Sequence, residues 1–145
     1  MVLGQYTSTI DNKNRSALPK KFRDELGSTL IITKGLDTQL IIVPVKQWKT
    51  LLEGTDGKPF IQRDVRQLQR FLLGNATEFE LDTKGRFVLP DYLREYAHIS
   101  NEIVYVGIGR FVEVWDKKIW TKSQEEIGEK GMIADIAEKL AETHE

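Results

Sequence analysis

The sequence has no cysteine and only two histidines, His98 and His144. Without cysteine there are no disulfides, no thiolate chemistry and no cysteine-based zinc sites, and two histidines are too few for a histidine-rich metal centre. No Ser/His or Cys/His pair is available for nucleophilic catalysis, and a phosphate-binding G-x-x-x-x-G-K-[ST] loop is missing. We therefore expect neither a metal nor a cofactor.

Long apolar runs are missing as well. No stretch approaches the roughly 18 residues needed to cross a bilayer. The start of the chain, MVLGQYTSTID, lacks the basic and apolar regions of a signal peptide. We therefore expect a cytoplasmic protein without a membrane partner. With 145 residues, 40% hydrophobic and 30% charged, the chain fits one globular domain or two small halves that share a core.

One sequence frame is present twice. The string DNKNRSALPKKFR at 11–23 and the string DTKGRFVLPDYLR at 82–94 share the pattern D-x-K-[N/G]-R-x-x-L-P-x-x-[F/L]-R. Each copy is followed by a β-rich run with a glycine-containing turn, TLIITKGLDTQLIIVP and EIVYVGIGRFVEVWD, which predicts a β-hairpin. Each half is therefore predicted to contain a strand, a turn, a short strand, a short helix, a hairpin and a helix.

The repeat predicts the domain organisation. We place the first half at 1–53 and the second at 72–122, with a linker and connecting helix at 54–71 and an acidic helical tail at 123–145. A half of about 50 residues closes only a thin core. We therefore expect a β-rich α+β fold in which the halves interlock around a pseudo-twofold axis as one barrel with flanking helices.

The start of each frame predicts a turn with a defined geometry. In the first turn (residues 11–15), Asp11 can accept a hydrogen bond from the backbone two residues on, and Asn14 tolerates positive φ. Such a turn projects Lys13 and places Arg15 where the next strand begins. The second turn (residues 82–86) repeats this set with Asp82, Lys84, Gly85 and Arg86.

Several helices are predicted from their boundaries and periodicity. Pro19 and Pro90 suit the first turn of a short helix, where a missing N–H costs nothing. Asp116 is expected to cap the helix in DKKIWTKSQEEI. In MIADIAEKLAETHE, the terminal helix has an apolar face formed by Met132, Ile133, Ile136 and Leu140.

The segment RDVRQLQRFLLG predicts a connecting helix with two faces. Its apolar stripe consists of Val65, Leu68, Phe71 and Leu72. Another face consists of Arg63, Arg66 and Arg70. This basic face is compatible with a solvated helix surface, which is the common case, and with a ligand site.

Charge is distributed unevenly along a chain of net charge −1. Residues 11–23 hold five basic side chains against Asp11, whereas residues 82–94 hold three against two acids. Residues 122–145 hold three lysines against seven acids. A basic head and an acidic tail predict phosphate binding at one end only, with the first turn as the favoured contact.

Three interpretations of the repeated turn are open on these grounds. A catalytic dyad formed by Asp11 and Asp82 is disfavoured, because the neighbouring Lys and Arg would hold both carboxylates ionised and apart. A salt-bridged structural corner explains a single copy well. The lysine at the middle of both turns, which a corner does not need, favours DNA-contacting loops whose Arg binds guanine or phosphate.

The duplicated frame, the N-terminal LG and the string VEVWD resemble the MraZ family of bacterial regulators. Its halves belong to the SpoVT/AbrB-like swapped-hairpin group, which includes the AbrB regulators and the MazE antitoxins. The resemblance covers roughly residues 1–140 and implies a double-split, swapped-hairpin barrel. It also implies DNA contacts by Lys13, Asn14 and Arg15, with Asp11 holding the loop.

For the second turn, the resemblance implies that Lys84 and Arg86 contact DNA or a ring interface, with Asp82 as the brace. Asn14 departs from the glycine that many members carry, but it tolerates the same conformation.

The resemblance further implies a sequence-specific, autoregulatory transcription regulator of the division and cell-wall gene cluster. It would be a nucleoid-associated, ring-shaped homo-oligomer bound to direct repeats in double-stranded promoter DNA. We expect no enzymatic activity and no small-molecule substrate. The alternative is an antitoxin-like interaction module that uses the acidic tail.

Overall fold

The computed structural model describes residues 1–52, 57–58, 61–129 and 131–143. The first half contains β1 (Val2–Thr9), β2 (Arg15–Ala17), α1 (Lys20–Leu26), β3 (Thr29–Lys34), β4 (Leu40–Pro44), the 3-10 helix η1 (Val45–Gln47) and α2 (Trp48–Leu51). The connecting helix is α3 (Arg63–Gly74). The remaining elements are β5 (Thr77–Glu80), β6 (Arg86–Val88), α4 (Asp91–Tyr96), β7 (Glu102–Gly109), β8 (Val112–Asp116), α5 (Lys117–Ile127) and α6 (Met132–Glu142). The predicted succession of elements is confirmed in both halves, whereas most of the segment EGTDGKPFIQ lies outside the described residues.

The two halves exchange strands. A six-stranded antiparallel sheet has the order β1-β7-β8-β4-β3-β5, so the first strand of each half lies beside the hairpin of the other half. The register of β1 with β7 runs from Val2 opposite Gly109 to Thr9 opposite Glu102. In the middle of the sheet, β4 pairs with β8 and joins the two hairpins.

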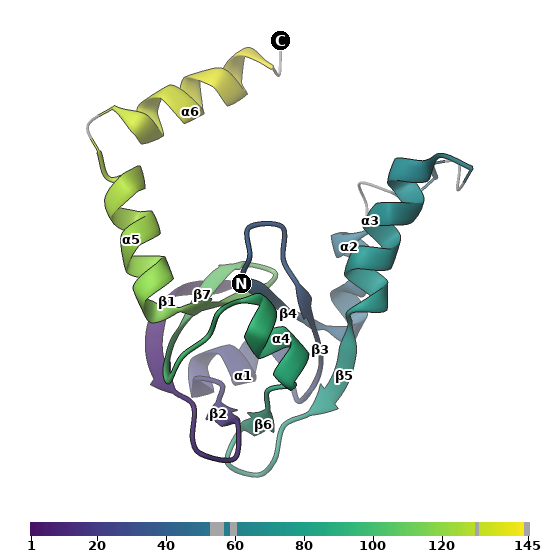
Figure 1. Ribbon diagram of the computed structural model, residues 1–145, viewed down its shortest axis with the longest axis vertical. Helices are drawn as coiled ribbons and strands as arrows, with labels where there is room; N and C mark the ends of the chain where they lie inside the picture. The colour runs from purple at the N-terminus through teal and green to yellow at the C-terminus, as the bar shows by residue number, and fades with distance from the viewer. Residues whose placement is uncertain (53–56, 59–60, 130, 144–145) are drawn as a thin grey trace.

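A second, two-stranded sheet relates the two turns. Ser16 of β2 lies opposite Phe87 of β6, and Arg15 and Arg86 flank this pair. Both turns therefore lie at the same end of the molecule, as Figure 1 shows beside β2 and β6. The described strands close no barrel, since β1 and β5 remain the edges of the larger sheet, so the predicted barrel is not confirmed.

The core lies between the sheet and the short helices α1 and α4. All five residues of β4 are buried, and in β3 Leu30 and Ile32 face the core. Phe22 of α1 and Leu93 of α4 are completely buried against them. These apolar side chains come from both halves of the chain, so their burial in a shared core stabilises the two halves as one folded unit.

One buried polar contact joins the two sheets. The hydroxyl of Tyr105 on β7 donates to Ser16 Oγ on β2 at 2.7 Å. Burial raises the pKa of Tyr105 far above its usual value, so the phenol remains a neutral donor.

The connecting helix α3 binds the body through its predicted apolar stripe. Val65 and Leu72 are buried, and the Phe71 ring packs against Tyr96 of α4 with centroids 5.9 Å apart. Thr33 of β3 donates to the carbonyl of Leu72 at 2.7 Å. On the basic face of α3, Arg63 and Arg70 are exposed and Arg66 is partly exposed, and the helix projects beyond the sheet (Figure 1).

The C-terminal helices also extend away from the body (Figure 1). Asp116 accepts from the backbone N–H of Ile119 at 3.3 Å, which confirms the predicted cap of α5. The apolar face of α6 is exposed, with between 41% and 58% of each side chain accessible at Met132, Ile133, Ile136 and Leu140.

The prediction for the two prolines was wrong by one position. Pro19 and Pro90 have extended ψ angles of 138° and 139° and are the N-cap residues, so α1 and α4 begin one residue later. A cap residue has non-helical dihedrals, and the extended proline supplies them while its carbonyl accepts the first helical hydrogen bonds.

Candidate nucleic-acid interface

The first turn is built around the carboxylate of Asp11. Its Oδ1 accepts from the backbone N–H groups of Lys13 and Arg15, both at 2.8 Å. Its Oδ2 accepts from Arg15 Nε at 2.9 Å. Asn14 adopts the predicted left-handed conformation with φ 59°, which is what allows the chain to reverse.

The second turn has the same geometry. Asp82 Oδ1 accepts from the backbone of Lys84 at 2.9 Å and of Arg86 at 2.8 Å. Asp82 Oδ2 accepts from Arg86 Nε at 2.9 Å, and Gly85 has φ 75°. The sequence repeat is therefore a structural repeat down to individual hydrogen bonds.

Both aspartates are held ionised. The largest cause of the lowered pKa of Asp11 is the hydrogen bond from the Arg15 backbone, and the Arg86 backbone has the same effect on the pKa of Asp82. A carboxylate held in this way has no tendency to share a proton. The arrangement matches a brace rather than an acid–base dyad.

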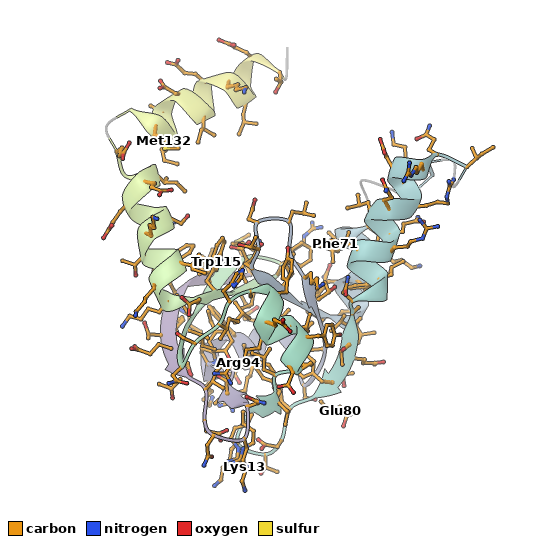
Figure 2. All side chains as sticks on the ribbon, in the orientation of Figure 1. Lys13, Phe71, Glu80, Arg94, Trp115 and Met132 are labelled. Carbon is orange, nitrogen blue, oxygen red and sulfur yellow. The ribbon has the colours of Figure 1, made fainter. Side chains whose placement is uncertain are left out.

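The basic side chains of the turns are accessible. Lys13 and Lys84 are exposed, whereas the side chains of Arg15 and Arg86 retain about a third of their surface, 31% and 32%. No described residue accepts a hydrogen bond from the Nη groups of Arg15. Figure 2 shows Lys13 at the outer end of its turn, on the side away from the sheet. A fixed guanidinium edge beside an exposed ammonium suits contact with phosphate or a base edge.

Each turn is held by the opposite half of the chain. The backbone carbonyl of Asn14 accepts from Leu89 N–H at 2.7 Å, and that of Gly85 accepts from Leu18 N–H at 2.9 Å. Side chains follow the same exchange. Arg94 of α4 donates to the side chain of Asn14, whereas Arg23 of α1 lies against Gly85.

Sequence reasoning did not assign a role to Arg23 and Arg94. The signal was present, because the repeated frame ends with an arginine in both copies. The sequence did not reveal the contact partner of either arginine, because each lies against the turn of the opposite half of the chain. Counting charges along the chain also misassigned the surroundings, because Arg23 belongs spatially to the second turn.

The basic segment after the first turn is partly neutralised. Lys20 Nζ lies 3.0 Å from Asp24 Oδ2 within α1. Lys21 is exposed, and Arg23 is engaged at the second turn. The exchange of Arg23 for Arg94 leaves the number of arginines at each turn unchanged, but Asp24 and Asp91 lower the positive charge near the first turn. Both turns therefore remain candidate contacts.

Two other kinds of feature, a metal-binding cluster and a helix able to span a membrane, are absent from the part of the chain that the structure describes. That part contains no cluster of three or more His, Cys, Asp or Glu side chains that could hold a metal ion. Within the same residues, no helix is long and apolar enough to cross a membrane.

These features define a class: a duplicated α+β protein whose halves exchange strands and present two matched basic turns at one end. A family model described as "MraZ protein, putative antitoxin-like" matches residues 1–71 and again residues 72–142. The chain belongs to the MraZ family.

Curated relatives named "Transcriptional regulator MraZ" match over most of the chain. The relative from Carboxydothermus hydrogenoformans is 40% identical over 142 residues, which cover 98% of each chain. That from Desulfitobacterium hafniense is 44% identical over 120 residues, covering 83% of this chain and 84% of the relative. That from Clostridium tetani is 38% identical over 143 residues, covering 98% of each.

Proposed function

We propose that the protein is a sequence-specific, DNA-binding transcription regulator without a cofactor or catalytic activity. The observation that carries the proposal is the pair of matched turns, each with an exposed lysine and a braced arginine, at one end of the molecule. Family membership supports it, because the curated relatives are named as transcriptional regulators.

In this function Arg15 supplies the main contact to a base edge or phosphate, and Lys13 supports it as a point charge on phosphate. The bond from Arg15 Nε to Asp11 fixes the guanidinium, so less side-chain entropy is lost when DNA binds. Asn14 supplies the left-handed position between them. Lys84 and Arg86 of the second turn contact DNA in the same way or form part of a subunit interface.

The biological setting follows from the family resemblance. We propose a homo-oligomeric ring in the cytoplasm, associated with the nucleoid, that binds direct repeats in the promoter of the division and cell-wall gene cluster. It regulates its own expression. A single turn binds weakly, but several turns on one ring acting on spaced repeats gain affinity by multivalency. Closure of the two halves into a swapped-hairpin barrel is part of the same proposal.

A titrated gel-shift assay with the DNA upstream of the protein's own gene tests this function. Arg15→Ala is expected to weaken binding by about 10- to 100-fold, the range for loss of one bidentate arginine contact. Arg86→Ala, measured in parallel, reports whether the second turn touches DNA. Lys20→Ala is a suitable control, because Lys20 already pairs with Asp24. Unchanged binding by Arg15→Ala, with the oligomer intact, would contradict the assignment.

A second candidate function is an antitoxin-like interaction module. The observation that favours it is the exposed apolar face of α6 on an acidic helix, which offers a surface to a protein partner. Ending the chain at Gly128 removes α6 and keeps α5. A DNA regulator retains operator binding after this truncation, whereas an interaction module loses its partner.

A further inference from the structure

We propose that Arg94 is a positioning residue for DNA binding: it holds the first turn in its binding shape through the side chain of Asn14. The inference rests on the proposed function, and it names a residue of the second half as necessary for recognition by the first half. Figure 2 shows Arg94 nearer to the body of the protein than Lys13, behind the turn rather than at its tip.

The contact is a chain of side-chain hydrogen bonds. Arg94 Nη1 donates to Asn14 Oδ1 at 2.5 Å, and Asn14 Nδ2 donates to Asp91 Oδ1 at 2.9 Å. Both ends of the Asn14 amide are therefore fixed by α4. Because Asn14 lies between Lys13 and Arg15, fixing its side chain also fixes the backbone that directs those two residues.

Arg94 is itself held rigidly. Its Nε donates to the carbonyl of Ile99 at 3.1 Å, and its Nη2 donates to the carbonyl of Ser100 at 2.9 Å. These bonds tie the guanidinium to the loop between α4 and β7, and they use donors that a phosphate contact would need. The side chain is also only partly exposed. Its geometry is that of a brace, not of a contact.

The second turn lacks this lock. Gly85 has no side chain, and a Cβ built there would lie 1.5 Å from Arg23 Nη1. Arg23 therefore fills the space against the second turn without a side-chain acceptor at this position. The two turns have the same backbone shape, but only the first is held by hydrogen bonds to the side chain of its left-handed residue, Asn14. The first turn should therefore lose less conformational entropy than the second when DNA binds.

A double-mutant cycle on binding tests the inference, with the DNA upstream of the protein's own gene as the probe. Asn14→Gly keeps the left-handed backbone and removes the contact, and Arg94→Ala removes it from the other side. Each is expected to weaken binding by about fivefold, as for loss of one hydrogen bond. The free energy of binding lost in the double variant should be smaller than the sum of the two single losses, because both changes remove the bond between Arg94 and Asn14, although each also removes a bond of its own. Additive losses would overturn the inference.

Salt dependence separates a brace from a direct phosphate contact. Removing one phosphate contact reduces the slope of log K against log salt by about 0.9. We expect the slope of Arg94→Ala to equal that of the wild type, and Arg94→Lys to bind as weakly as Arg94→Ala, since lysine lacks the planar fork. A reduced slope, or rescue by lysine, would show that the charge of Arg94 acts on DNA directly.

Amide hydrogen exchange tests the same contact without DNA. In Arg94→Ala, the backbone amides of Lys13 and Arg15 should exchange about fivefold faster than in the wild type. If Arg94→Ala folds poorly, Asn14→Gly serves as the second variant and should show the same increase. Those of Lys84 and Arg86 in the same molecule are the internal control. Arg23→Ala is the matched variant and should leave the first turn protected. Unchanged exchange alongside normal wild-type DNA binding overturns the inference alone, whereas a wild type that binds no operator DNA overturns the proposed function as well.

Discussion

Asp11 and Asp82 each accept three hydrogen bonds within a stretch of only five residues. Each carboxylate closes its own turn and fixes its own arginine. Their chemical role is therefore geometric. The charge of the aspartate matters because an ionised carboxylate accepts hydrogen bonds more strongly than a neutral acid or amide.

This role predicts an acid-dependent contribution to stability. Since the folded pKa of both aspartates is lowered, the stabilisation is present above the unfolded value of about 3.9 and is lost as pH falls through the folded value. Asp11→Asn and Asp82→Asn should each lower the melting temperature at pH 7, and the gap from wild type should shrink between about pH 5 and pH 3. Thermal unfolding followed by circular dichroism at several pH values measures this gap. A gap that stays constant across the series contradicts the braced-carboxylate interpretation.

At the scale of elements, Asp116 joins three pieces of structure. It ends β8, caps α5 through Ile119 and accepts from the N–H and hydroxyl of Ser100 at 3.0 and 2.8 Å. Burial raises the pKa of Asp116, but these hydrogen bonds outweigh it and the pKa is lowered overall. The residue thus orients α5 relative to the sheet, together with the bond from Trp120 Nε1 to Gln5 Oε1 at 2.8 Å.

Asp116→Ala is expected to lower the free energy of unfolding by about 1–3 kcal/mol, since it removes a cap and leaves the Ser100 donors without their acceptor. Urea unfolding monitored by tryptophan fluorescence measures the loss. Lys118→Ala, an exposed position in the first turn of the same helix, is the control and should change stability little. A loss for Asp116→Ala no larger than that of the control would argue against this joining role.

Elements defined by local contacts were predictable from the sequence. The turns were predictable because the hydrogen bonds of Asp11 with other described residues all involve residues 13–15. The helix α3 was predictable because its apolar stripe repeats at helical spacing. The contacts between the two halves were not predictable residue by residue. The repeated frame shows an arginine at the position of Arg94 in both copies, but it does not show that Arg94 contacts Asn14 of the other half. The predicted barrel required a closed sheet, which hydrogen-bond pairing of the described strands does not provide.

At the scale of the whole molecule, neither half is a complete structural unit. The partners of β1, β2 and β5 all belong to the opposite half, and β4 pairs with β8 at the junction of the two hairpins. Residues 1–71 alone retain the β3–β4 hairpin but lose most other strand contacts. Three or more paired strands with a covered face are generally needed for independent stability.

We therefore expect a fragment of residues 1–71 to show no cooperative thermal transition as a monomer. Mixing it with residues 72–145 should restore the transition and the fluorescence of buried Trp115. Circular dichroism and size-exclusion chromatography of each fragment and of the mixture measure this. A monomeric first fragment that melts cooperatively near the temperature of the intact chain would contradict the interdependence of the halves.

The pairing of β1 with β7 has a consequence for synthesis of the protein. β1 leaves the ribosome before β7, and Gly109, the partner of Val2, emerges only after all the residues between them have been translated. Until then the nascent chain carries an unpaired strand edge and apolar side chains that the finished protein buries, the situation in which chains aggregate or recruit chaperones. The sheet can therefore complete its pairing only after β7 has emerged, and contacts that are distant in sequence are expected to slow its folding.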